Sequence, residues 1–240
     1  MPPVNLDDIN GYVSRVAEFF DTNLGPSVVD VYRLGSLAHG GFSSVYSDID
    51  VGVLLDCAEP PVKMTEAIAA SKYLDSRYGT KLSVFWGNPD FAWGRLPVID
   101  RLDLLDHGVP LLHDHKPEFN RPAAAEIRQA LLDSFERSYK SRLPELLSLG
   151  RLEPHNRKPY IRTVLYPARF IYTWDRLAVD SNDRAVNYLQ QIRPAGLDIK
   201  PIELALACRQ EKCAVEDVFA HRTDLDRQFE AMITYTSQMG

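Results

Sequence analysis

The sequence has 240 residues, long enough to bury a core without disulfides or metal ions, either as one large domain or as two small ones. Hydrophobic residues make up 45% and charged residues 25%, values of ordinary globular domains that exclude a disordered or fibrous chain. The net charge of -6 offers no basic surface for a long nucleic acid, so we expect small-molecule partners.

The longest apolar runs, such as VGVLL at 51–55, are too short to cross a bilayer. The first residues lack the basic and then apolar pattern of a secretory signal. The three cysteines, Cys57, Cys208 and Cys213, are too few and too scattered for a disulfide framework. We therefore expect a cytoplasmic protein without a membrane segment; the composition does not indicate its oligomeric state.

The first half of the chain alternates helical and strand patterns. Apolar residues at helical spacing predict a helix over 6–22, with Asn5 as its N-cap. Runs rich in β-branched residues predict strands at 28–34 and 48–56. A helix over about 64–78 and a strand at 81–86 follow. This order predicts a small domain with a mixed sheet over residues 1–118.

From about Pro122 onward the patterns are helical, with no strand candidate. Residues 158–177 read as one helix, Ser181 and Asp198 resemble N-caps, and a last helix is predicted over about 214–238. We expect an α+β protein in which an all-α helical bundle domain, residues 119–240, follows the mixed-sheet domain.

The stretch GSLAHGGFSSVYSDID, 35–50, joins the first two predicted strands. Asp48 and Asp50 are two residues apart, so on a strand both would point to one side while Ile49 faces the core. Two adjacent carboxylates repel one another unless a cation lies between them, and Mg²⁺ combines such carboxylates with substrate phosphates. Gly35 would let the backbone approach a phosphate, and the Ser36 hydroxyl could donate to it.

This pattern resembles the nucleotidyltransferase fold of the DNA polymerase β superfamily, in particular the enzymes that adenylylate streptomycin and spectinomycin. The matching residues are Gly35, Ser36, Gly40, Gly41, Ser47, Asp48 and Asp50, although the loop before Ser47 is slightly longer than in that pattern. The resemblance extends weakly to residues 162–189. It implies transfer of AMP from ATP to a hydroxyl of a small molecule such as an aminoglycoside, with pyrophosphate released. Asp48 and Asp50 would hold Mg²⁺, and Gly35, Ser36 and Ser47 would position the triphosphate.

The family usually takes a third carboxylate from the next central strand, but KLSVFW at 81–86 contains no acid. The expected register places Lys81 at this position, where a cation would weaken a metal site. Asp90, Asp133 and Glu136 are candidates for the missing base. Alternatively, the protein is a catalytically impaired relative that binds nucleotide or a partner. A third alternative, the antitoxin of a toxin–antitoxin pair, fits less well because such proteins lack the helical half.

Other features have simpler interpretations. The segment DLLDHGVPLLHDH, 103–115, is rich in His and Asp, and His113 and His115 could bind zinc on one strand face, but an exposed polar turn is the favoured interpretation. His39 is expected to face solvent. The aromatic residues Phe85, Trp86, Phe91 and Trp93 could stack on a ligand or pack in the core.

Overall fold

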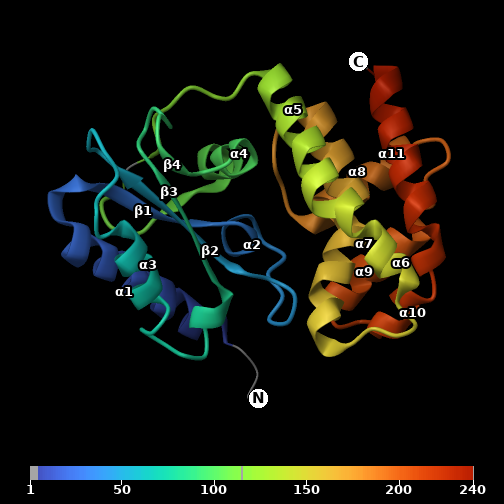
Figure 1. Cartoon of the computed structure of the whole chain (residues 1–240), viewed down its shortest axis with the longest axis horizontal. Helices are drawn as coiled ribbons and strands as arrows, with labels where there is room; N and C mark the ends of the chain where they lie inside the picture. Colours follow the sequence, from blue (N-terminus) through green and yellow to red (C-terminus); the bar gives the residue numbers. More distant parts are fainter. Residues whose placement is uncertain (1–4, 115, 240) are drawn as a thin grey trace. The chain divides into compact units, whose positions relative to one another are not determined.

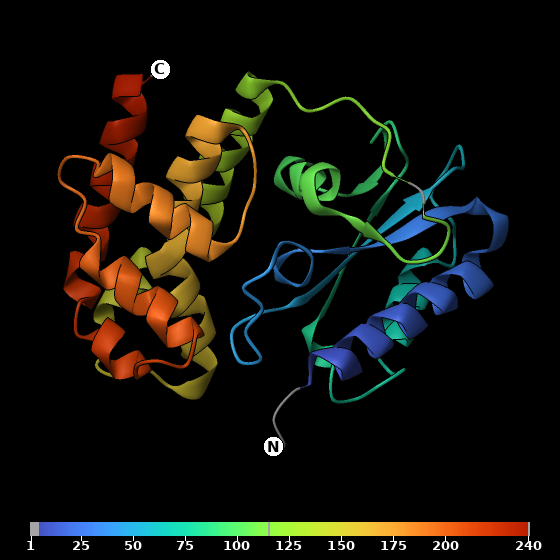
Figure 2. The same ribbon diagram turned by 180° about the vertical axis from the view of Figure 1, so that it is seen from behind.

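The computed structural model describes residues 5–114 and 116–239 and contains two compact units, residues 1–122 and 123–240 (Figures 1 and 2). The change from mixed to purely helical sequence patterns predicts a boundary between residues 118 and 119. The boundary between the two units lies slightly later, between residues 122 and 123. Each unit has its own buried side chains and is described by itself.

Unit 1 is built on a five-stranded mixed sheet in the order β4-β3-β2-β1-β5. The strands are β1 (Val28–Leu34), β2 (Ile49–Leu55), β3 (Leu82–Gly87), β4 (Gly94–Arg95) and β5 (Val109–Pro110). The central strand β2 is antiparallel to β1 and parallel to β3. The fold class expected from the sequence is therefore confirmed, with the three longer strands within one residue of their predicted positions.

Helices cover both faces of this sheet (Figure 1). On one face, α1 (Leu6–Leu24) and α3 (Met64–Ser71) pack against alternate residues of β2, among them Ile49, Val51 and Val53. Leu54 points to the other face, where it clusters with Leu104 of α4 (Val98–His107). Because side chains alternate along a strand, Asp50 belongs to the α4 face, and Ile49 lies in the core as predicted.

The described residues of unit 2 form helices joined by loops and turns, and none of them lies in a strand. Its α-helices are α5 (Ala124–Ser134), α6 (Leu143–Ser148), α7 (Pro154–Arg176), α8 (Asn182–Ile192), α9 (Lys200–Arg209), α10 (Val215–Phe219) and α11 (Leu225–Met239). In the core, the Phe135 ring lies 5.2 Å from Phe229 and 6.4 Å from Phe170, centroid to centroid.

Several predicted helix boundaries are confirmed. The Asn5 side chain accepts the backbone N–H of Asp7 and caps α1. Ser181 caps α8 in the same way, through the N–H of Arg184. The N-cap of α9 is Ile199 and not Asp198, although the Asp198 carboxylate still accepts the N–H of Lys200.

Three expectations about helices are wrong. The helix predicted over 64–78 ends at Ser71, and the helix predicted over 214–238 is two helices, α10 and α11, separated by a 3₁₀ turn at Arg222–Asp224. Asp224 lies just before α11 and contacts Arg227, an arrangement that favours a new helix N-terminus. The segment 103–115 was expected to be an exposed polar turn, but residues 103–107 are the last part of α4.

Among the described residues, no helix is both long and apolar enough to span a membrane.

Candidate functional site

The turn after β1 and the loop before β2 are joined by side-chain hydrogen bonds. Gly35 has φ +61°, a conformation that glycine adopts at low cost, and the one-turn helix α2 (Ser36–His39) follows it. The Ser36 hydroxyl donates to the Ser47 hydroxyl at 3.0 Å. The Ser47 hydroxyl also accepts the backbone N–H of Ser43 at 2.9 Å. Two segments eleven residues apart in the sequence are thereby held together.

The two aspartates lie at the start of β2, beside this turn. Asp48 directly precedes the strand, and Asp50 is its second residue, paired with Leu34 of β1. A Cβ atom on Gly35 would overlap the Asp50 carboxylate, so this carboxylate lies directly against the Gly35 backbone. The close approach explains why this position requires glycine. The structure thus brings Gly35 and Asp50 together, and Ser36 and Ser47 together, within one small region of unit 1.

The residue beside Asp50 on the next strand is Ser83, not Lys81. The parallel register pairs Asp50 of β2 with Ser83 of β3. Lys81 precedes β3, at the end of a 3₁₀ turn, and its ammonium group donates to the carbonyl oxygen of Ser44. The expected register was therefore two residues off, but the position is still occupied by a residue without a carboxylate.

The three candidate bases lie in different surroundings. Asp90 follows the far end of β3: from Ser83 to Gly87 alone the strand advances about 13 Å at the usual rise per residue. Asp90 is thus at the wrong end of the strand to assist Asp50. In unit 2, Asp133 pairs with Arg137 at 3.3 Å and Glu136 pairs with Lys140 at 2.8 Å, both on the exposed surface. Such pairs are typical of a solvated helix face.

Asp103 and His39 are the residues that the sequence interpretation missed. The Asp103 carboxylate accepts the backbone N–H of Gly35 at 2.6 Å, and the side chain is 8% exposed. The expectation that His39 faces solvent is wrong, because its side chain is only 9% exposed and its ring lies 5.5 Å from that of His107. The sequence did contain one sign of a buried acid. Asp103 stands between two leucines, Leu102 and Leu104, and all three are buried residues of α4.

The zinc site and the magnesium site considered from the sequence require different sets of ligands. Among residues 5–114 and 116–239, no group of three or more His, Cys, Asp or Glu side chains could hold a metal ion. His115, one of the two histidines considered for zinc at 103–115, lies outside the described residues, so that interpretation is not tested here. The pair Asp48 and Asp50 suits Mg²⁺, which commonly takes one or two carboxylates and completes its oxygen shell with phosphates and water.

The four aromatic residues near the third strand are partly buried and pack against the core of unit 1. Trp86 and Trp93 lie 5.9 Å apart and contact the core beneath α1 and α3. Phe85 and Phe91 contact the cluster on the α4 face. Of the two interpretations left open by the sequence, the structure favours core packing.

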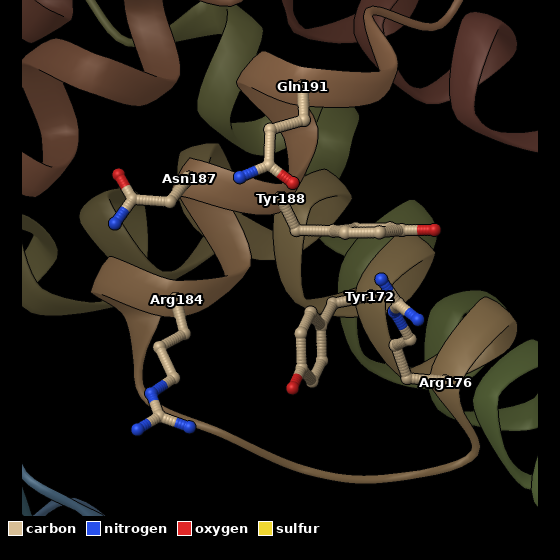
Figure 3. Close-up of a pocket in the computed structure, with 6 residues that line it drawn as sticks. All are labelled: Tyr172, Arg176, Arg184, Asn187, Tyr188 and Gln191. Carbon is tan, nitrogen blue, oxygen red and sulfur yellow. The ribbon is translucent and has the colours of Figure 1, made fainter.

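Unit 2 contains an open pocket of about 390 Å³ between α7 and α8 (Figure 3). It is lined by Tyr172, Arg176, Arg184, Asn187, Tyr188 and Gln191. The two tyrosine hydroxyls donate to carboxylates, Tyr172 to Asp180 at 3.3 Å and Tyr188 to Asp175 at 2.8 Å, and burial raises the pKa of both tyrosines. The lining therefore combines two neutral phenols with two guanidinium groups and two carboxamides, so it is rich in N–H donors.

Comparisons with known proteins rest on structure alone. No family model and no curated protein matches the sequence. A solved structure does match: the spectinomycin adenyltransferase AAD(9) from Enterococcus faecialis with ATP and spectinomycin, at a TM-score of 0.60 and 14% identity. The match covers 93% of this chain and 99% of that one. The chain shares the fold of that adenyltransferase. At this identity the likeness establishes the fold, and the activity has to be argued from the site.

Proposed function

We propose that this protein transfers a nucleoside monophosphate, AMP from ATP, to a hydroxyl group of a small molecule such as an aminoglycoside. The observation that supports the proposal is the meeting of three features in unit 1: the Gly35–Ser36 turn, the Ser47 hydroxyl and the Asp50 carboxylate. The shared fold with an adenyltransferase supports the reaction class at a coarse level.

In the proposed reaction, Asp48 and Asp50 would hold Mg²⁺, and the ion would supply the positive charge that offsets the phosphates. Gly35 lets the backbone approach the triphosphate closely. The Ser36 and Ser47 hydroxyls, already joined at 3.0 Å, position its oxygens. The acceptor hydroxyl forms the new P–O bond, the bond to pyrophosphate breaks, and the proton of the hydroxyl passes to a base or to water.

The net charge of the chain and the side chains of the unit 2 pocket indicate which acceptors to screen. The chain is acidic overall, with a net charge of -6, which suits a cationic acceptor and offers little to a long polyanion. Resistance to an aminoglycoside antibiotic would be one consequence of such a transfer. The N–H donors in the pocket of unit 2 suit a molecule rich in hydroxyl or other oxygen groups, and we would therefore include uncharged and anionic acceptors in a screen.

The first prediction concerns nucleotide binding. Asp48→Ala and Asp50→Ala should each abolish the magnesium dependence of ATP binding, because each removes one of two proposed metal ligands. Calorimetric titration of ATP with and without Mg²⁺ measures this effect. Asp56→Ala is the matched control, since Asp56 is an exposed acid just beyond the other end of β2. Unchanged binding in both site variants would show that the nucleotide does not bind there.

A second candidate function is supported by Ser83 and Lys81. A nucleotidyltransferase fold without an acid beside Asp50, and with an ammonium group bound to the loop at Ser44, fits a protein that binds nucleotide or a partner without transferring anything. The two candidates differ in one product. Release of pyrophosphate from ATP in the presence of aminocyclitol acceptors supports the enzyme, and tight Mg-ATP binding with no release across the whole acceptor screen supports the binding protein.

A further inference from the structure

The backbone of Gly35 lies between two carboxylates. On one side its N–H donates to Asp103 of α4 at 2.6 Å, a short, charge-assisted hydrogen bond. On the other side the Asp50 carboxylate lies where a Cβ atom of residue 35 would be. The position of Gly35 relative to Asp50 is therefore set in part by Asp103, a residue 68 positions away in the sequence.

The two oxygens of the Asp103 carboxylate have different surroundings. Its Oδ1 atom is buried and has no hydrogen-bond partner in unit 1 as described. Nε2 of His39 lies 3.9 Å from this oxygen, within reach of an ion pair when the imidazole is protonated but too far for a hydrogen bond. A buried carboxylate oxygen without a hydrogen bond is unfavourable, and replacing a buried ionic group by an apolar side chain of similar size is often neutral or stabilising.

We propose that Asp103 is a positioning residue for the nucleotide site. By accepting the N–H of Gly35, it holds the Gly35–Ser36 turn at the distance from Asp50 that the triphosphate and its Mg²⁺ require. Asp103 acts through the turn and does not itself contact nucleotide or metal. This inference rests on the proposed function, since it assumes that the turn binds the triphosphate of ATP.

The test compares nucleotide affinity with stability in the full chain. Asp103→Leu removes the acceptor and the unpartnered oxygen together. We expect the Kd for Mg-ATP, measured by calorimetry, to rise about tenfold, the change expected for the loss of one hydrogen bond that orders a binding loop. We expect the melting temperature to stay the same or to rise. A purely structural role would lower the melting temperature and leave the affinity of the folded protein unchanged.

Two variants separate the hydrogen bond from other effects. Asp103→Asn keeps an oxygen that can accept from Gly35, so it should bind Mg-ATP nearly as well as the wild type. Asp106→Asn is the matched control on the same helix, because it weakens the ion pair with Arg121 and does not contact Gly35. It should bind like the wild type.

The possible outcomes are distinct. If the wild type does not bind Mg-ATP, the proposed function and this inference both fail. If the wild type binds but Asp103→Leu, still folded, binds equally well, only the inference fails. If Asp103→Leu does not fold, Asp103→Glu provides the test. This variant keeps the negative charge but moves the acceptor by one methylene toward the turn. Weaker binding then supports positioning, and wild-type affinity overturns it.

Discussion

At the residue scale, the clearest feature of unit 1 is the use of carboxylates to hold backbone segments in place. Asp103 holds Gly35, and the fully buried Asp30 accepts the N–H groups of Val31 at 2.7 Å and of Leu112 and His113 at 3.1 Å each. Both acids are far in sequence from most of the groups they bind. Which N–H groups lie beside each carboxylate depends on the folded chain, and sequence periodicity does not reveal it.

Asp75 provides a residue-scale test that depends on pH. Its carboxylate accepts hydrogen bonds from the Arg77 side chain at 2.7 and 3.0 Å, and this interaction lowers the pKa of Asp75 from 3.8 to about 2. Because the folded-state pKa is depressed, the pair stabilises the protein above pH 3.8, and this stabilisation is lost as the pH falls toward about 2.

We therefore expect Asp75→Asn to melt at a lower temperature than the wild type at neutral pH, with the difference shrinking between about pH 4 and pH 2. The effect should be small, since Arg77 is largely exposed. Thermal melts of both proteins over this pH range measure it. A difference that stays constant down to pH 2 would mean that the carboxylate charge is not responsible.

At the element scale, helix ends explain both the successes and the failures of the sequence interpretation. Asn5 and Ser181 were recognised because a cap acts on residues two or three positions away, a distance that the sequence shows directly. The break at Arg222–Asp224 was missed because the residues on both sides keep a helical apolar pattern. The two-residue strands β4 and β5 were missed because pairing with β3 and β1, not local pattern, defines them.

Ser181→Ala should lower the free energy of unfolding by about 1 kcal/mol, the usual cost of losing an N-cap side chain. The Ser181 hydroxyl is the acceptor for the N–H of Arg184 at the start of α8. Urea denaturation followed by circular dichroism gives the change. Ser237→Ala is a suitable control, because Ser237 is an exposed residue near the end of α11 whose hydroxyl donates within the helix; an equal loss in both variants would argue against the cap.

At the scale of the whole molecule, the chain joins a mixed-sheet unit and a helical unit that each have their own core. In the first, side chains from α1, α3 and the central strands cluster together; in the second, Phe135, Tyr166 and Phe229 pack within the helices. Units with separate cores are expected to be able to fold separately.

Residues 123–240 expressed alone should therefore give a soluble, helical protein with a cooperative thermal transition. Far-ultraviolet circular dichroism with melting is the measurement. The same fragment carrying Phe135→Ala should melt at a much lower temperature, because truncating a buried phenylalanine usually costs about 3–5 kcal/mol. A fragment that shows no cooperative transition would mean that the two units depend on one another for folding.

The fold class, the order of the longer strands and the candidate site residues at 35–50 could be predicted from the sequence. These depend on local rules: alternation on a strand, helical periodicity and the freedom of glycine. The folded structure was needed to show that Ser83 and not Lys81 lies beside Asp50, and that Asp103 accepts the N–H of Gly35. Strand register and buried polar contacts join residues that are far apart in the chain, so they are fixed by packing between elements and not by the pattern within any one of them.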